Sequence, residues 1–139
     1  MTDHVMVPIA VGELFDKISI LEIKAERIDD DSKLRNVGIE LGMLNRISME
    51  LDCSKDEEVI SLRKELKAIN EAIWDAENLV RQVAREGFGE SFAAVARLTY
   101  SNNDRRAAIK RRINLLSGSL LIEEKSHSDR PRELDPQQL

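Results

Sequence analysis

Hydrophobic residues recur at helical spacing along most of the chain, and the first such stretch covers residues 12–28. Its apolar positions follow alternating steps of four and three residues: Leu14, Ile18, Leu21, Ala25 and Ile28. This spacing is that of one face of an amphipathic helix. Three further apolar residues fall off that face: Phe15, Ile20 and Ile23. The helix is therefore expected either at the centre of a bundle or in contact with a second subunit.

The pattern that follows predicts a second helix over about residues 33–51. Residues 29–32 are three aspartates and a serine, whose side-chain oxygens can cap the start of this helix. Within it, Gly38 and Gly42 lie one turn apart. That spacing favours a close crossing with another helix.

A third helix is expected to begin near Lys55, because Ser54 and Glu57 have the spacing of a capping box. Its apolar face has no missed step: Val59, Leu62, Leu66, Ile69, Ile73, Ala76, Val80 and Val83. A helix that continues to about Arg85 would be about 45 Å long at 1.5 Å per residue. Because shorter neighbours cannot cover an apolar face of that length, we expect the protein to form a homodimer.

The last third of the chain predicts two helical pieces. Gly87 and Gly89 can end the third helix, and residues 91–100 then predict a short helix. Ser101 and Asp104 again have capping spacing, so residues 103–118 predict a separate or kinked helix. Residues 119–126 fit either a last helical turn or an edge strand.

The two ends of the chain differ from the helical middle. Pro8 favours a short extended segment over residues 5–11, and the polar, proline-containing residues 126–139 are typical of a disordered tail. The predicted fold class is all-α: an antiparallel helical bundle with long coiled-coil-like helices and a short extended N-terminal segment. Residues 1–125 are expected to form a single helical domain.

Composition excludes several classes of protein. Of the 139 residues, 34% are charged and 4% aromatic, and the net charge is −5, which argues against a β-sandwich and against nonspecific binding to nucleic acid. The single Cys53 cannot form an internal disulfide, and the apolar run at residues 5–11 is too short to span a membrane. We therefore expect a cytoplasmic protein that does not bind membranes.

Metal-binding patterns are weak. The only histidines, His4 and His127, lie near the ends of the chain. Two pairs of acids are one turn apart: Glu22 with Glu26, and Glu71 with Asp75. Their oxygens suit Mg²⁺, but acids at this spacing usually form a solvated helix face. No metal or other cofactor is expected.

The most unusual stretch is NDRRAAIKRRIN, residues 103–114, which places four arginines and one lysine in an acidic chain. On a helical wheel the buried line is Ile109, Ile113 and Leu116. Four polar residues border this line: Asn102, Arg105, Arg106 and Arg112. Three residues are expected to point into solvent: Ala107, Lys110 and Arg111.

The bordering residues are candidates for binding an anion or a partner, together with cations of the first helix and one acid of the third. The full candidate set is Lys17, Lys24, Glu77, Asn102, Arg105, Arg106 and Arg112. One interpretation is a set of interhelical salt bridges, because a guanidinium at the margin of a core needs a partner. The alternative is a pocket in which Arg105 and Arg106 hold a phosphate or carboxylate.

Three stretches resemble a known family: GELFDKISILEIKAERI (residues 12–28), NDRRAAIKRRIN (103–114) and GSLLIEEKS (118–126). The family consists of small, uncharacterised bacterial helical proteins associated with genes for cell-surface polysaccharide synthesis. The resemblance implies a bacterial cytoplasmic protein, and it carries over no catalytic residues.

Two functional hypotheses remain open. The first is a non-enzymatic interaction module that dimerises and presents a charged surface to a protein partner, linked to surface polysaccharide assembly. The alternative is a small-ligand enzyme or binding protein for an anionic substrate, which would be held by Arg105 and Arg106.

Overall fold

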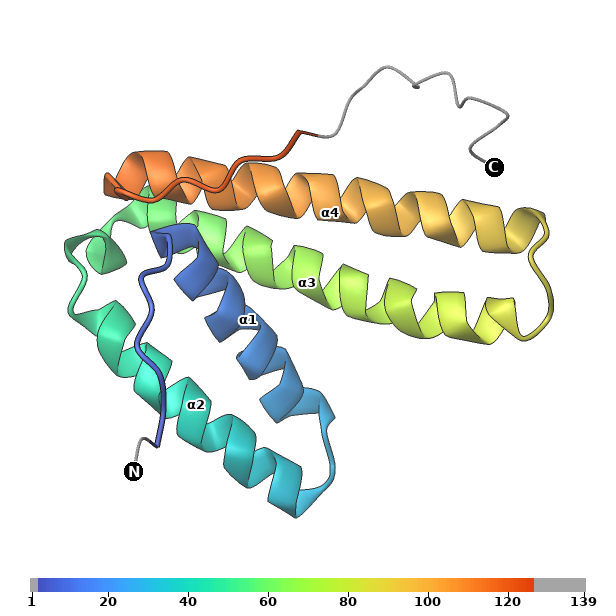
Figure 1. The fold of residues 1–139 in the computed structure, drawn as a ribbon, viewed down its shortest axis with the longest axis horizontal. Helices are drawn as coiled ribbons and strands as arrows, with labels where there is room; N and C mark the ends of the chain where they lie inside the picture. Colours follow the sequence, from blue (N-terminus) through green and yellow to red (C-terminus); the bar gives the residue numbers. More distant parts are fainter. Residues whose placement is uncertain (1–2, 127–139) are drawn as a thin grey trace.

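The computed structural model describes residues 3–126, which form four helices and a short 3-10 helix. They are α1 (Val11–Arg27), α2 (Asp31–Met49), η1 (Asp52–Lys55), α3 (Glu57–Ala84) and α4 (Glu90–Ser117). The described part of the chain contains no strand, so the predicted all-α class is confirmed. Figure 1 shows two antiparallel hairpins, α1 with α2 and α3 with α4, and the longer second hairpin projects beyond the first.

Helix α1 lies at the centre of the core. Phe15 and Ile18 are completely buried, as are Val59 and Leu66 of α3 and Ile113 of α4. Ile23, which also lies off the predicted apolar line, is buried as well. The extra apolar residues of α1 are therefore explained by its central place, because one face cannot serve neighbours on several sides.

The residues that cap α2 and α3 are aspartates. Asp30 accepts a hydrogen bond from the backbone N–H of Lys33, in agreement with the predicted capping stretch. The predicted cap of α3 was wrong: Asp56 accepts from the N–H groups of Glu58 and Val59, whereas Ser54 lies inside η1. Asp56, two residues after Ser54, caps the helix because it follows η1 directly and lies at the free N–H groups of the helix start.

Helix α4 is continuous, which corrects the prediction of a break near residue 101. Two polar side chains near the predicted break bond to the preceding turn. The Thr99 hydroxyl donates to the carbonyl of Val95, and the Asn103 amide donates to that of Thr99. These bonds to the preceding turn are compatible with an unbroken helix, and no glycine or proline interrupts residues 90–117.

The segment after α4 is neither a helical turn nor a strand. Gly118 takes the left-handed conformation, with φ of 67°, and ends the helix, as Gly87 with φ of 119° does after α3. Residues 119–126 have no regular structure and run back along α4 (Figure 1). The predicted disordered tail lies, except for Ser126, outside the described residues.

The close helix crossing occurs at Gly12 and not at Gly38 or Gly42. A Cβ atom at Gly12 would lie 2.5 Å from the backbone oxygen of Lys110, whereas one at Gly38 or Gly42 would meet no described atom within 4 Å. The glycine pair of α2 faces solvent. The prediction failed because spacing alone cannot tell which side of a helix another helix covers.

This difference gives a direct test of the fold. Gly12→Ala should lower the free energy of unfolding by about 1 to 3 kcal/mol, because α1 and α4 must separate to admit the methyl group. Gly42→Ala should leave it unchanged or raise it by up to about 1 kcal/mol, because alanine favours an exposed helical position. Urea unfolding followed by circular dichroism measures both, and equal effects of the two changes would contradict the crossing.

Candidate functional site

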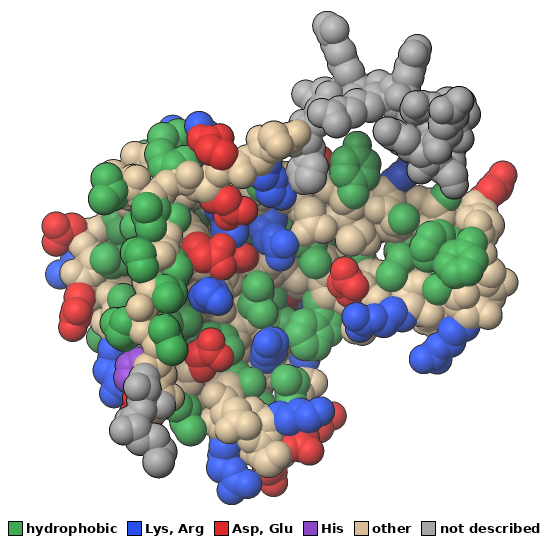
Figure 2. Space-filling model, in the orientation of Figure 1, with side chains coloured by type: hydrophobic (Ala, Val, Ile, Leu, Met, Phe, Trp, Pro, Cys, Tyr) green, Lys and Arg blue, Asp and Glu red, His purple; other side chains and the backbone are tan. Residues whose placement is uncertain are grey.

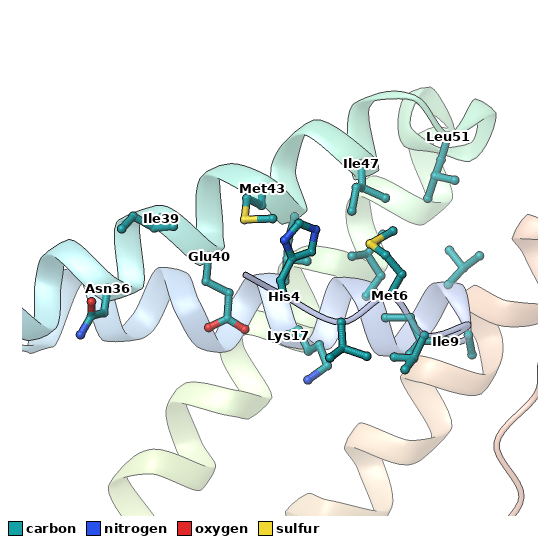
Figure 3. A pocket seen from close by; sticks show the side chains of 16 residues that line it. His4, Met6, Ile9, Lys17, Asn36, Ile39, Glu40, Met43, Ile47 and Leu51 are labelled. Carbon is teal, nitrogen blue, oxygen red and sulfur yellow. The ribbon is translucent and has the colours of Figure 1, made fainter. Parts of the chain in front are cut away.

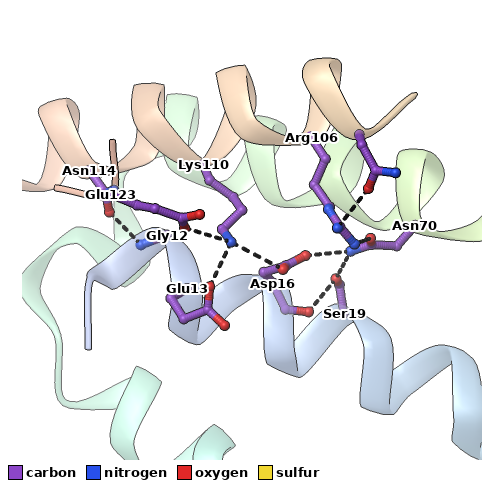
Figure 4. Close-up of polar contacts among 10 residues, drawn as sticks. Gly12, Glu13, Asp16, Ser19, Asn70, Arg106, Lys110, Asn114 and Glu123 are labelled. Atoms are coloured by element: carbon purple, nitrogen blue, oxygen red, sulfur yellow. Dashed lines mark hydrogen bonds and ion pairs between the residues drawn. The ribbon is translucent and has the colours of Figure 1, made fainter. Parts of the chain in front are cut away.

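A partly buried ion-pair cluster centred on Lys110 joins α1 to α4. The Lys110 ammonium lies 2.6 Å from a Glu13 oxygen, 3.4 Å from an Asp16 oxygen and 3.2 Å from a Glu123 oxygen. Only 12% of the Lys110 side chain is exposed. Figure 4 shows it reaching from α4 towards α1, with Glu123 approaching from the segment after α4. One cation thus holds two helices and the returning chain together.

Asn70 of α3 extends this cluster to Arg106. Its amide nitrogen donates to Asp16 and to the Ser19 hydroxyl, both at 2.7 Å. Its amide oxygen accepts from Arg106 at 3.2 Å, and Arg106 also donates to Asn103 at 2.8 Å (Figure 4). Asn70 therefore links the negative Asp16 to the positive Arg106 without direct contact between the two charges.

The network is fully hydrogen-bonded. Among residues 3–126, every buried polar atom of a side chain has a partner. Burial is the largest influence on the pKa of Lys110 and would lower it. The hydrogen bond that Lys110 donates to Glu13, the charge of Asp16 and the contact with Glu123 together outweigh burial, so the pKa of Lys110 is raised. The amine is therefore firmly protonated near neutral pH.

The position of Lys110 corrects the prediction that it points into solvent. Asn102 and Asn114 of α4 are buried as Ile113 is, so the face of α4 that packs is wider than its apolar line. At about 100° per residue, Lys110 lies about 60° from Ile113 on the side that meets α1. The apolar residues of α4 marked only part of the packed face, because Lys110 faces the carboxylates of α1.

The predicted arginines separate in the structure. Arg105 is exposed and makes no ion pair with any residue of the described range. Arg112 pairs with Glu58 at 2.9 Å, and both side chains are more than half exposed. Arg106 is half-buried and donates hydrogen bonds to the side-chain amide oxygens of Asn70 and Asn103 instead of pairing with the expected carboxylate. Arg105 and Arg106 therefore do not form a shared pocket.

The remaining predicted candidates also lie apart. Glu77 pairs with Arg81 along α3 at 3.9 Å. Lys17 is exposed beside the N-terminal segment, and Lys24 is half-buried on α1. Of the predicted set, only Glu77 and Arg106 line the same hollow.

That hollow lies at the junction of α1, α3 and α4 and has a volume of about 310 Å³. Trp74 and Ile73 of α3 and Ile20 of α1 supply its apolar lining. Arg106 and Arg81 supply positive charge. The Arg27 guanidinium, which does not line the hollow, lies over the Trp74 ring at 5.9 Å from the ring centre.

The acid pairs considered for Mg²⁺ serve partly as interhelical ion pairs. Arg27 of α1 contacts Asp75 at 2.7 Å and Glu71 at 3.6 Å. Glu26 pairs with Lys67 of α3. In the described range, no three His, Cys, Asp or Glu side chains are grouped as a metal site would require.

An open apolar groove runs between α2 and the extended N-terminal segment, which we define as residues 4–10 (Figure 3). Its volume is about 700 Å³. Residues of α2 at helical spacing form one wall, among them Ile39, Met43 and Ile47. Lys17 and Glu40 add one charge of each sign. Neither forms an ion pair within the described residues.

The second open surface is the projecting end of the α3–α4 hairpin, residues 77–101, which we call the arm. None of its residues is buried. It carries three of the five aromatic residues of the chain, Phe88, Phe92 and Tyr100. Phe88 is 79% exposed and Tyr100 65%. Figure 2 shows hydrophobic side chains gathered at this end of the molecule.

Comparison with known proteins places the chain in a family. Residues 5–132 match the model of DUF6165, a family of unknown function. The chain belongs to this family. No curated protein and no solved structure matches it. Among the described helices, none is both long enough and apolar enough to cross a membrane.

The Lys110 cluster leads to a test of stability against pH. Lys110→Met should lower the free energy of unfolding by about 2 to 3 kcal/mol at neutral pH, because it leaves three carboxylates without their shared cation. The raised pKa stabilises the fold below the ordinary lysine value of 10.5. That contribution is lost as the pH rises through the folded-state pKa. The difference between the variant and the wild type should therefore shrink above about pH 10.5.

Arg111→Met is the matched control for this test. Arg111 is the next residue of α4, and its ion pair with Glu124 is exposed. An exposed pair contributes at most about 1 kcal/mol. Urea unfolding at several pH values compares the two variants. A loss at Lys110 no larger than that at Arg111 would show that the cluster does not hold the helices together.

Proposed function

We propose that this protein is a non-enzymatic interaction module that self-associates through the arm. The observation that carries the proposal is that residues 77–101 bury no side chain although their apolar pattern continues from the core. On α3 this pattern includes Val80 and Val83, and on α4 it includes Phe92 and Val95, all of them only half-buried. Two helices alone cannot enclose such residues, whereas two hairpins can form a four-helix bundle.

The composition of the arm supports a second copy of this chain as its partner. Interfaces are enriched in aromatic residues, and the arm holds more than half of those in the chain. Its charges are balanced, with three arginines and three glutamates, although the whole chain carries −5. Two identical neutral surfaces can meet without the repulsion that the rest of the surface would impose. A two-fold pairing of this kind closes on itself.

The chemistry of the titratable groups supports a role without catalysis. Desolvation by burial raises the pKa of the Cys53 thiol and so disfavours its nucleophilic thiolate form. Lys110 stays protonated because its pKa is raised, so it is no base at neutral pH. The hydrogen bond that Lys67 donates to Glu26 likewise raises the pKa of Lys67. None of these three groups is activated by a lowered pKa.

The groove beside α2 supports a second contact, with a protein partner. We propose that it takes an amphipathic helix, because its α2 wall presents Ile39, Met43 and Ile47 at helical spacing. Methionine side chains adapt to varied apolar surfaces. Lys17 and Glu40 can pair with charges of opposite sign on the polar flank of such a helix. The polar residues 127–139 lack the apolar face that this groove requires.

The resemblance noted in the sequence supports a setting for this partner. The three resembling stretches lie in α1, in α4 and in the segment after α4, which are the elements joined by the Lys110 cluster. We propose on this basis that the protein is bacterial and cytoplasmic and acts beside surface polysaccharide assembly.

Self-association through the arm predicts a dimer in solution. Leu98→Glu should convert the protein to a monomer, because it places a charge on the exposed apolar surface of the arm. Leu115→Glu is the control: it lies on the same helix at similar exposure, 54% against 50%, but outside the arm. Sedimentation velocity at micromolar concentration measures the mass. A monomeric wild type, or a dimer that survives Leu98→Glu, would refute the arm as the interface.

The groove is tested with Met43→Asp, which places a charge on its α2 wall. The wild type and Leu98→Glu should both capture the partner protein from the native cell extract. Met43→Asp should not capture it. Its binding segment should then be reproduced by a synthetic amphipathic helical peptide, measured by calorimetry. A binding segment without helical character, or a second copy of this chain in the groove, would contradict the proposed occupant.

A further inference from the structure

We propose that the hollow between α1, α3 and α4 binds a small planar anion, an aromatic ring bearing a carboxylate or a phosphate. This site is separate from the groove and does not depend on the identity of a protein partner. Its central group is Arg106, whose positive charge meets two neutral amides within the described residues and no carboxylate.

Arg106 is held in place and still has donors to offer. A guanidinium carries five N–H groups, and two of them serve Asn70 and Asn103. Asn70 is itself fixed, because it is buried and donates to Asp16 and Ser19. A half-buried guanidinium fixed in this way can receive an oxyanion through paired hydrogen bonds with little further loss of conformational freedom.

The charge around the hollow favours an anion. Its ionisable lining residues are Arg81, Arg106 and Glu77, which carry a net charge of one positive unit. Arg81 contacts Glu77 only at 3.9 Å, and its side chain is 74% exposed. It is therefore free to turn towards a bound oxyanion. This local excess is opposite to the net charge of −5 of the chain.

The apolar side of the hollow favours a ring. Trp74 presents a flat aromatic surface, and Ile20 and Ile73 lie beside it. A planar ligand can stack on or against such a surface while its charged group reaches the arginines. The volume of about 310 Å³ lies at the lower end of the range for small-molecule sites, about 300 to 1,000 Å³. A single ring with one anionic group therefore fits better than a nucleotide.

Of the two arginines predicted to hold an anion, Arg105 and Arg106, only one belongs to the proposed site. Arg106 stays, whereas Arg105 points into solvent and takes no part. The second cation comes from α3, as Arg81. Since α4 is continuous, Asp104 is not at a helix start and does not compete with the anion for a helix end.

Trp74 is the only tryptophan of the chain and so reports on its own site. Its fluorescence should be titrated with benzoate, phenyl phosphate and inorganic phosphate at constant ionic strength. We expect a saturable change with both ring compounds, at least tenfold weaker binding of inorganic phosphate, and the tighter ring compound to identify the preferred anion. A change that grows linearly with every compound, without saturation, would overturn the site.

Variants separate binding from folding. Arg106→Ala should weaken binding of the better ring compound at least tenfold, and Arg106→Lys should restore part of it, because lysine keeps the charge but lacks the paired donors. Arg105→Ala, the adjacent exposed residue, should bind as the wild type does. Arg81→Ala changes an exposed side chain of the arm and should weaken binding severalfold in the Leu98→Glu background, in which self-association cannot alter the hollow. Wild-type affinity in both Arg81→Ala and a folded Arg106 variant would overturn the proposal.

Discussion

The contact between the first turn of α1 and the last turns of α4 is the constraint on which the rest of the structure depends. Helix α1 has no side-chain cap of its own at Ala10. The N–H of Gly12 instead donates to the Asn114 side chain at 2.7 Å, and that of Val11 donates to the Ser119 hydroxyl at 3.2 Å. Two of the free donors that open every helix are thus satisfied by residues 102 and 108 positions later in the chain.

This contact determines where the other elements can lie. Lys110 adds its ion pairs one turn before Asn114, and Asn70 carries the same network to α3. Because α1 is tied to one end of the long hairpin, it covers only that end, and α2 packs against α1 (Figure 1). Within residues 3–126 of the single chain, the opposite end, the arm, has no further helix packed on it. The open arm is therefore a consequence of the polar crossing and not of weak apolar character in α3 or α4.

The sequence predicted the elements better than it predicted their contacts. Periodicity is local, so it located the helices and the apolar face of α3, whose Val59 and Leu66 are buried. It could not choose between Ser54 and Asp56 as a cap, because both are good capping residues and only the geometry of η1 separates them. It also misassigned Lys110. A lysine beside apolar residues is expected to face solvent. The acids that pair with Lys110 are Glu13 and Asp16, 97 and 94 positions away, and the sequence does not show that they lie opposite it.

The missed site residues nevertheless left a signal in α1. Asp16 and Ser19 lie on either side of Ile18, among the apolar positions of α1 that pack, and both are buried in the structure. Polar residues on the packed side of a central helix need partners from other helices. Buried polar networks are satisfied in few arrangements, whereas apolar contacts tolerate sliding. The Asp16, Asn70 and Lys110 contacts therefore fix how α1, α3 and α4 align, and that alignment brings Arg106 and Trp74 to the same hollow.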